Sequence, residues 1–118
     1  MEEFLNAVKE AKMRIWGECK FLPEGLINIL NEKENNLDIK ILLDHKNIFP
    51  KEKQQREQTE KEEKEEKYRI SKRPLTDTYF IIDEDSFVYS TILNKFSRYP
   101  WITEKETFML YWDSSAEF

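Results

Sequence analysis

The sequence has very few of the residues that build covalent links and metal centres. Among its 118 residues there are one cysteine, Cys19, and one histidine, His45. A single cysteine cannot form an intramolecular disulfide, and one Cys with one His cannot complete a zinc site. We therefore expect no bound metal and no cofactor, and Cys19 is interpreted as a small buried core residue.

Long apolar segments and excess positive charge are also missing. No run approaches the roughly 18 apolar residues of a membrane span, and the N-terminus lacks the pattern of a signal peptide. The sequence contains 19 Lys and Arg against 24 Asp and Glu, a formal net charge of -5. We expect a cytoplasmic protein with no membrane contact, in which the charge disfavours nucleic-acid binding.

The sequence does contain enough apolar material for one core. Hydrophobic residues make up 39% of the chain and aromatic residues 14%, while Gly is scarce. A chain of this length is too short for two independent cores, so we expect one domain over residues 1–118. Whether that domain is excised from a longer chain is left open. Frequent Lys, Glu, Ile and Asn give it an archaeal-like composition.

The N-terminal third alternates helical and strand patterns. Residues 2–12 place apolar side chains three and four apart, which predicts a helix. Residues 13–21 alternate as a strand, in which Gly17 permits the close approach of another backbone. A second helix is predicted from Pro23, and residues 37–43 form a near-continuous apolar strand. This order predicts parallel pairing of the two strands.

The rest of the chain contains an insertion and further strands. Residues 50–67 carry no apolar side chain except proline, so they are expected to be an exposed helix or disordered. Residues 68–72 predict a short strand. Two strands over residues 78–83 and 87–90 are predicted to form a hairpin, linked by Glu84-Asp85-Ser86.

The C-terminal residues are harder to assign from their pattern. Residues 93–101 are read as irregular, residues 108–112 (FMLYW) as a last strand, and Asp113 as the opening of a helix. Together these elements predict an α/β fold with helices packed on a mixed sheet.

The element order and the hairpin resemble one half of the phospholipase D superfamily. That family has His, any residue, Lys, four residues and Asp along the hairpin, followed by a small pair and often an Asn. Thr76 stands at the His position, Thr78 at the Lys position and Asp83 at the Asp position. Ser90 begins the small pair, and Asn94 is a looser match. We call these five residues the frame residues.

The resemblance implies a binding role because the catalytic pair is missing. In the family the histidine attacks phosphorus and the lysine stabilises charge on the phosphoryl oxygens, and threonine does neither at neutral pH. The pattern is similar to degenerate domains of archaeal transcriptional regulators of the TrmB type. It therefore implies a non-catalytic regulatory or ligand-sensing domain. Because complete family sites combine two halves, it also implies a homodimer.

Several other residues are candidates for ligand contact. Asp44 and Asp113 follow predicted strands, where open α/β sheets bind ligands, although each also suits a capping role. Arg69, Lys72 and Arg73 form a small basic cluster for an anionic or sugar ligand.

Other functions remain open at this stage. An acidic trio in the hairpin, residues 83–85, is read as turn chemistry rather than as a metal site. His45 is read as a polar loop residue, and the aromatic residues near the C-terminus as core or as a protein interface. The alternatives are a nucleic-acid-processing phosphodiesterase or nuclease fragment, and a nucleic-acid-binding accessory domain.

Overall fold

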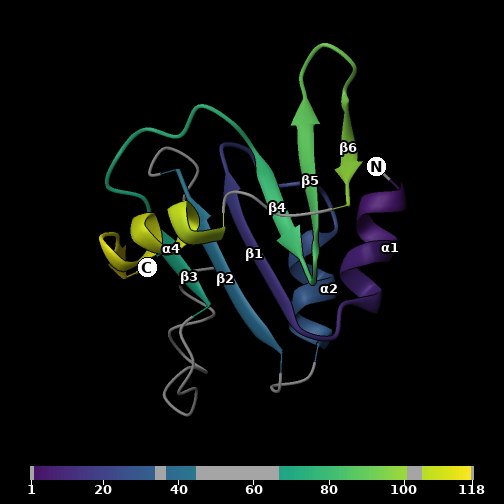
Figure 1. Cartoon of the computed structure of the whole chain (residues 1–118), viewed down its shortest axis with the longest axis horizontal. Coiled ribbons are helices and arrows are strands. Elements are labelled where there is room, and N and C mark those ends of the chain that lie inside the picture. The colour runs from purple at the N-terminus through teal and green to yellow at the C-terminus, as the bar shows by residue number, and fades with distance from the viewer. Residues whose placement is uncertain (1, 34–36, 45–66, 101–104, 118) are drawn as a thin grey trace.

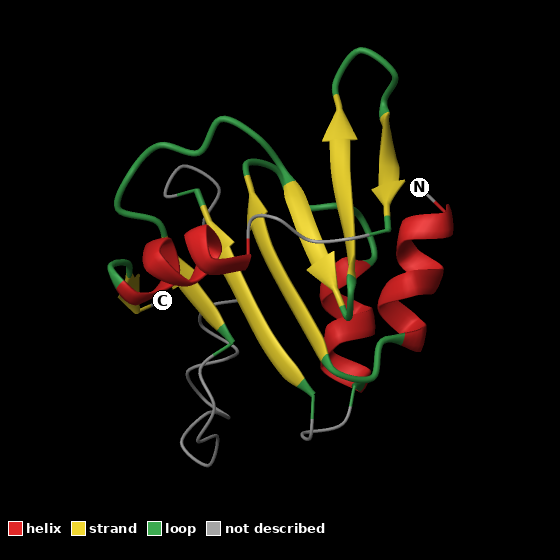
Figure 2. Cartoon of the chain, viewed as in Figure 1, coloured by secondary structure: helices red, strands yellow, loops and turns green. Residues whose placement is uncertain are grey.

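The described chain forms one mixed sheet with helices on both of its faces (Figures 1 and 2). The computed structural model describes residues 2–33, 37–44, 67–100 and 105–117. Its helices and strands, in chain order, are α1 (Glu2–Glu10), β1 (Arg14–Cys19), α2 (Leu26–Glu32), β2 (Asp38–Leu43), β3 (Tyr68–Ile70), β4 (Tyr79–Ile82), β5 (Asp85–Ser90), β6 (Lys95–Tyr99), α4 (Lys105–Asp113) and β7 (Ala116–Glu117).

Within the described residues the sheet has seven strands in the order β6-β5-β4-β1-β2-β3-β7. β1 and β2 are parallel, with Arg14 opposite Asp38 and Cys19 opposite Leu43, which confirms the parallel prediction. β3 also runs parallel to β2, and the remaining pairs are antiparallel. The α/β class and the mixed sheet are therefore as predicted.

Helices α1 and α2 cover one face of the sheet, which we call the back face. Phe4 and Val8 of α1 and Leu26 and Leu30 of α2 are buried there against apolar strand residues. The strand residues of this core include Ile39, Ile41, Phe80 and Ile82, at most 5% exposed. Periodicity predicted both helices because burying an apolar stripe is what stabilises such short helices.

Gly17 gives this core room for an aromatic ring. A Cβ at Gly17 would lie 2.3 Å from the Phe80 ring, far inside van der Waals contact. The expectation that a backbone approaches Gly17 was wrong in its detail, because the close neighbour is a side chain on the paired strand β4.

Helix α4 covers the opposite, front face and corrects the prediction of a last strand. Phe108 and Trp112, four residues apart, are buried against Trp16, Leu42 and Ile81. An unbroken apolar run such as FMLYW fits a strand and a buried helix equally well, and the spacing of the buried pair is that of a helix. Asp113 therefore ends a helix and does not open one.

The hairpin is confirmed, with a shorter turn than expected. Ile82 pairs with Asp85, so the turn consists of Asp83 and Glu84, and Ser86 belongs to β5. Asp83 has φ 56, a left-handed conformation that a short polar side chain tolerates. The shorter turn lengthens β5 by two residues relative to the prediction.

Two further predictions concern less regular segments. The region read as irregular contains strand β6, which buries one residue, Phe96, and so gives a weak apolar pattern. The expected insertion at residues 50–67 lies outside the described residues except for Lys67.

In the part of the chain that the structure describes, no helix is both long and apolar enough to cross a membrane.

Candidate functional site at the ends of the parallel strands

Thr78 and Asp83 lie at opposite ends of β4. The four residues of that strand separate them, so the five-residue step corresponds to about 16 Å in extended chain. Thr76 precedes the strand, is exposed, and its hydroxyl lies 3.4 Å from an oxygen of Asp77. The structure thus brings Thr76 and Thr78 to one end of the sheet and Asp83 to the other.

Thr78 is buried and holds the chain that leaves β1. Its Oγ1 accepts hydrogen bonds from the backbone N–H of Lys20, at 3.0 Å, and of Phe21, at 3.3 Å. It is 4% exposed. The hydroxyl at the position of the family's lysine therefore satisfies two backbone donors in the part-buried turn after β1.

Asp83 holds the chain that enters β1. Its carboxylate accepts from the backbone N–H of Lys12 at 3.1 Å, Met13 at 2.7 Å and Arg14 at 3.2 Å. The Arg14 guanidinium donates to the Asp83 carbonyl at 2.6 Å. This single carboxylate fixes the link between α1 and β1, a role that sequence reasoning missed because its partners lie about 70 residues earlier.

Ser90 and Asn94 shape the turn between β5 and β6. The Ser90 hydroxyl accepts from Leu93 N–H at 3.1 Å, and the Ser90 carbonyl accepts from Asn94 N–H at 2.7 Å. Asn94 has φ 55, and its Oδ1 accepts a hydrogen bond from the Tyr89 hydroxyl. Both frame residues are engaged in local turn geometry.

The acidic trio of the hairpin points to three different partners. Asp83 faces backbone N–H groups, Glu84 lies 3.7 Å from Arg14, and Asp85 accepts from Arg98 Nε at 2.9 Å. Among the described residues, no group of three or more His, Cys, Asp or Glu side chains is arranged to hold a metal ion.

A buried carboxylate lies at the carboxyl end of β1. Glu18 is 4% exposed and accepts hydrogen bonds from Arg73 Nη2, at 2.9 and 3.1 Å, and from the Tyr79 hydroxyl at 2.9 Å. The Arg73 guanidinium stacks on Tyr111 of α4, 3.7 Å from the ring centroid. We call Glu18, Arg73, Tyr79 and Tyr111 the Glu18 cluster. A buried charge needs this pairing, since leaving it unpaired is costly.

The basic cluster predicted from the sequence consists of two arginines that dock α4 and one exposed lysine. Arg69 donates to the Trp112 carbonyl at 2.6 Å and lies 4.5 Å from the Trp112 ring centroid. Arg73 pairs with Glu18, so both arginines attach α4 to the sheet. Lys72 is exposed.

The two predicted strand-end aspartates have different positions. Asp44 follows β2, is 6% exposed, and its backbone N–H donates to the Cys19 carbonyl at 3.3 Å. Asp113 is exposed at the end of α4, so its assignment to a strand end was wrong. Asp44 and the Glu18 cluster thus lie at the same carboxyl edge of the parallel strands, where open α/β sheets bind ligands.

The thiol of Cys19, at the end of β1, is buried. Burial, with a smaller effect of the Glu18 carboxylate, raises its pKa far above the ordinary value. A protonated buried thiol is a poor nucleophile and a poor metal ligand.

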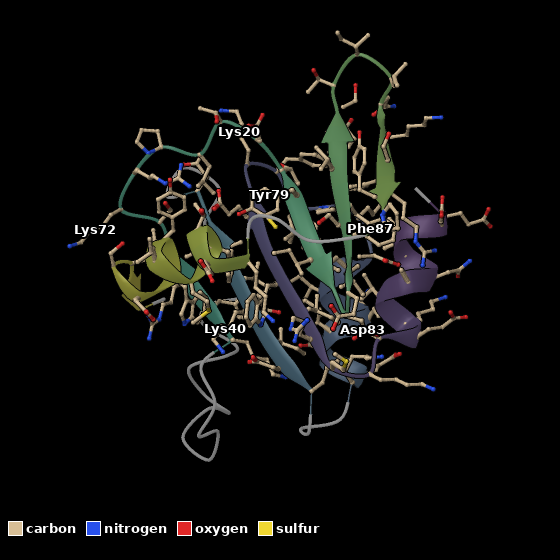
Figure 3. All side chains as sticks on the ribbon, in the orientation of Figure 1. Lys20, Lys40, Lys72, Tyr79, Asp83 and Phe87 are labelled. Atoms are coloured by element: carbon tan, nitrogen blue, oxygen red, sulfur yellow. The ribbon has the colours of Figure 1, made fainter. Side chains whose placement is uncertain are left out.

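Figure 3 shows how the labelled side chains are distributed over the sheet: Lys20 and Tyr79 lie toward one end, Lys72 toward the β3 side, and Asp83 at the opposite end. The exposed Lys20 ammonium donates to the Leu75 carbonyl at 3.3 Å. Lys20, Lys72 and the 38% exposed Arg73 side chain therefore place positive charge near the carboxyl edge.

Two surface hollows lie away from this edge, beside α1. One, of about 620 Å³, is lined by residues of α1, α2 and the segments that follow them: Lys9, Ala11, Lys12, Ile29, Glu32, Lys33 and Leu37. The other, of about 560 Å³, lies between α1 and the β4–β5 hairpin, and half of its lining residues are acidic. Of the residues that the sequence singled out, only Asp83 and Asp85 line either hollow.

The comparisons with known proteins bear on the fold. No family model matches the chain, and no curated protein sequence matches it. Among solved structures it is similar to TrmBL2, described as an archaeal chromatin protein with a novel mode of DNA binding, at a TM-score of 0.66 and 18% identity. The likeness covers 99% of this chain and 50% of that chain, so this chain spans about half the length of TrmBL2. At this identity the likeness establishes a shared fold.

Proposed function

We propose that this chain is a non-catalytic regulatory or interaction domain with a phospholipase D-like frame, of the kind found in transcriptional regulators of the TrmB type. The observation that carries the proposal is the hydrogen bonding of the Thr78 and Asp83 side chains. Both side chains are occupied by backbone N–H groups at opposite ends of β4. The histidine and lysine that carry the family's chemistry correspond to Thr76 and Thr78, so the Thr78 hydroxyl holds backbone N–H groups where the family's lysine would stabilise a phosphoryl oxygen.

The likeness to TrmBL2 supports a role in regulation. TrmBL2 is an archaeal chromatin protein that binds DNA, and this chain corresponds to half of it. In our proposal the present chain supplies a half whose task is to bind a ligand or a protein. The net charge of -5 and the engagement of Arg69 in docking α4 support this assignment.

The proposed ligand is a small anion or sugar at the carboxyl edge of β1 and β2. Arg73 is held rigidly by Glu18 and Tyr111, yet its side chain is 38% exposed. A fixed guanidinium loses little conformational entropy when it binds a carboxylate or phosphate, and the exposed Lys20 and Lys72 carry further positive charge after the ends of β1 and β3. Inorganic phosphate and a sugar phosphate are the probes to titrate by calorimetry. Binding that Lys72→Ala weakens, while Lys105→Ala on α4 does not, is the expected result.

An assay for hydrolysis tests the non-catalytic part of the proposal. The substrates are a bis-aryl phosphate and single- and double-stranded DNA, each with and without divalent metal. We expect no hydrolysis above background. Turnover that Thr76→Ala abolishes and the exposed change Lys105→Ala on α4 leaves intact would contradict the proposal and make Thr76 a nucleophile.

The second candidate is a nucleic-acid-binding accessory domain. The DNA-binding property of TrmBL2 favours it. Binding through phosphates must weaken steeply as salt rises, because each neutralised phosphate releases counterions. Titration of a DNA duplex at two salt concentrations therefore separates the candidates, since the regulatory proposal predicts no salt-dependent affinity for the duplex.

A further inference from the structure

Exposed apolar side chains gather on the β5–β6 hairpin. Six large hydrophobic residues of the described chain are exposed, and four of them lie here: Val88, Ile92, Leu93 and Tyr99. Ile92 is 91% exposed and Leu93 is 60% exposed, both at the tip. In Figure 1 this hairpin reaches past the ends of the other strands. Apolar side chains gathered in one place mark interaction surfaces, whereas single exposed ones need no explanation.

The charges of this hairpin fit a protein partner better than a nucleic acid. Arg98 donates to Asp85 through Nε at 2.9 Å, and its Nη1 lies 3.6 Å from Glu3 of α1. Its positive charge is therefore balanced within the chain. Lys95 is the other basic residue of the hairpin, and one lysine beside four apolar side chains is too little charge to bind a phosphate backbone.

Strand β6 lies at the edge of the sheet and pairs with β5 on one side. The main-chain groups of an edge strand can pair with another strand. Because Phe96 is buried on the back face, Lys95, Ser97 and Tyr99 share the front face. On the back, Phe4 stacks on Phe96 at a ring-centroid distance of 4.1 Å, so α1 covers that side of the strand.

The sequence of β6 is complementary to itself in antiparallel pairing. If two copies pair around a two-fold axis that passes between their Ser97 residues, each Ser97 faces the other. Lys95 of one copy then faces Tyr99 of the second copy. No like charges are directly opposite, and a lysine beside an aromatic ring is a favourable cross-strand pair. A symmetric pairing of this kind buries the same surface on both copies.

The same register brings the two exposed apolar ends of the hairpin together. Leu93 of the tip lies two residues before Lys95, which faces Tyr99, so Leu93 of one copy comes near Tyr99 of the other. We propose that a second copy of this chain docks on the β5–β6 hairpin, with the two β6 strands antiparallel. This inference rests on the hairpin surface and is independent of the ligand, the substrate and the frame residues.

Cross-linking at the symmetry axis tests the pairing. Directly opposite residues of an antiparallel pair have Cα atoms about 4.5 to 5.5 Å apart, which suits a disulfide. Ser97→Cys should therefore form covalent dimers under a mild oxidant at least about tenfold faster than Thr107→Cys, an exposed position on α4. The native Cys19 is 1% exposed and should not interfere. Equal rates for the two variants would overturn the proposed register.

Sedimentation equilibrium tests the surface without a new covalent bond. The unmodified chain should be a concentration-dependent dimer, and Leu93→Asp should raise the dimer dissociation constant by at least about tenfold. Leu110→Asp is the matched control because Leu110 is 69% exposed on α4. A monomer at all concentrations up to about 1 mM, or a dimer that Leu93→Asp leaves unchanged, would overturn the proposal.

Discussion

The two faces of the sheet are built from different chemistry. On the back face, α1 and α2 bury aliphatic side chains and the phenylalanine group around Phe4, with centroid distances of 4.1 to 5.9 Å. On the front face, α4 is held by tryptophan and tyrosine rings stacked against Arg69 and Arg73, above the buried Glu18 carboxylate. The back face contributes mainly apolar burial, while the front face combines burial with paired charge.

The largest effect is expected from crowding the back face. Gly17→Ala should lower the free energy of unfolding by about 2–3 kcal/mol, because the new Cβ meets the buried Phe80 ring. In urea unfolding, Phe80→Leu should partly relieve that cost, so the double variant should lose less than the sum of the single changes by about 1 kcal/mol. Strict additivity would show that the ring does not limit Gly17.

Loss of the Asp83 carboxylate should have the next largest effect. Asp83→Ala leaves the backbone donors of Lys12, Met13 and Arg14 without their acceptor, at a cost of about 2 kcal/mol. Asp83→Asn keeps one acceptor and tolerates the left-handed turn, so it should cost about half as much. Hydrogen exchange should quicken at residues 12–14 in both variants, and unchanged exchange there would exclude this role.

A smaller loss is expected at the charged front face. Arg73→Met removes the ion-pair partner of Glu18, and partial solvent access of Arg73 limits the cost to about 1–2 kcal/mol. Lys72→Met should stay within about 0.5 kcal/mol. Chemical denaturation of both variants checks the difference. Equal free energies of unfolding for the two variants would indicate that water replaces the Arg73 guanidinium without loss of stability.

The smallest structural effect should come from the last turn of α4. Arg69→Met removes the guanidinium that donates to the Trp112 carbonyl and stacks on its ring, at a cost of about 1 kcal/mol or less. Tryptophan fluorescence during unfolding should report earlier release of Trp112 than in the parent chain. If Trp112 is released at the same point of unfolding in the variant and in the parent chain, apolar burial alone docks α4.

The difference between the faces also explains what the sequence could predict. The helices and strands before residue 44 follow from local spacing, because burial of one stripe or of alternate residues decides their form. Helix α4 was read as a strand, since five consecutive apolar residues are compatible with both. Its covering helix was misassigned and Glu18 was not singled out, so the pairing of Glu18 with Arg73 and Tyr79 was missed.

The frame residues show a second limit of local patterns. The spacing of Thr78 and Asp83 was correctly placed on a hairpin, but their partners are backbone N–H groups near β1, more than 50 residues away in the chain. Spacing along one hairpin contains no information about which distant donors need an acceptor. Only the pairing of β4 with β1 brings these groups together.

The most direct test of the account compares Thr78→Val with Thr76→Val, with unfolding and phosphodiester hydrolysis measured on the same samples. Thr78→Val should lower the free energy of unfolding by about 1–2 kcal/mol, because the N–H groups of Lys20 and Phe21 lose their acceptor. Thr76→Val should change it by less than about 0.5 kcal/mol, and neither variant nor the parent should hydrolyse substrate. Unchanged stability of Thr78→Val, together with hydrolysis that it abolishes, would contradict a structural role for the frame.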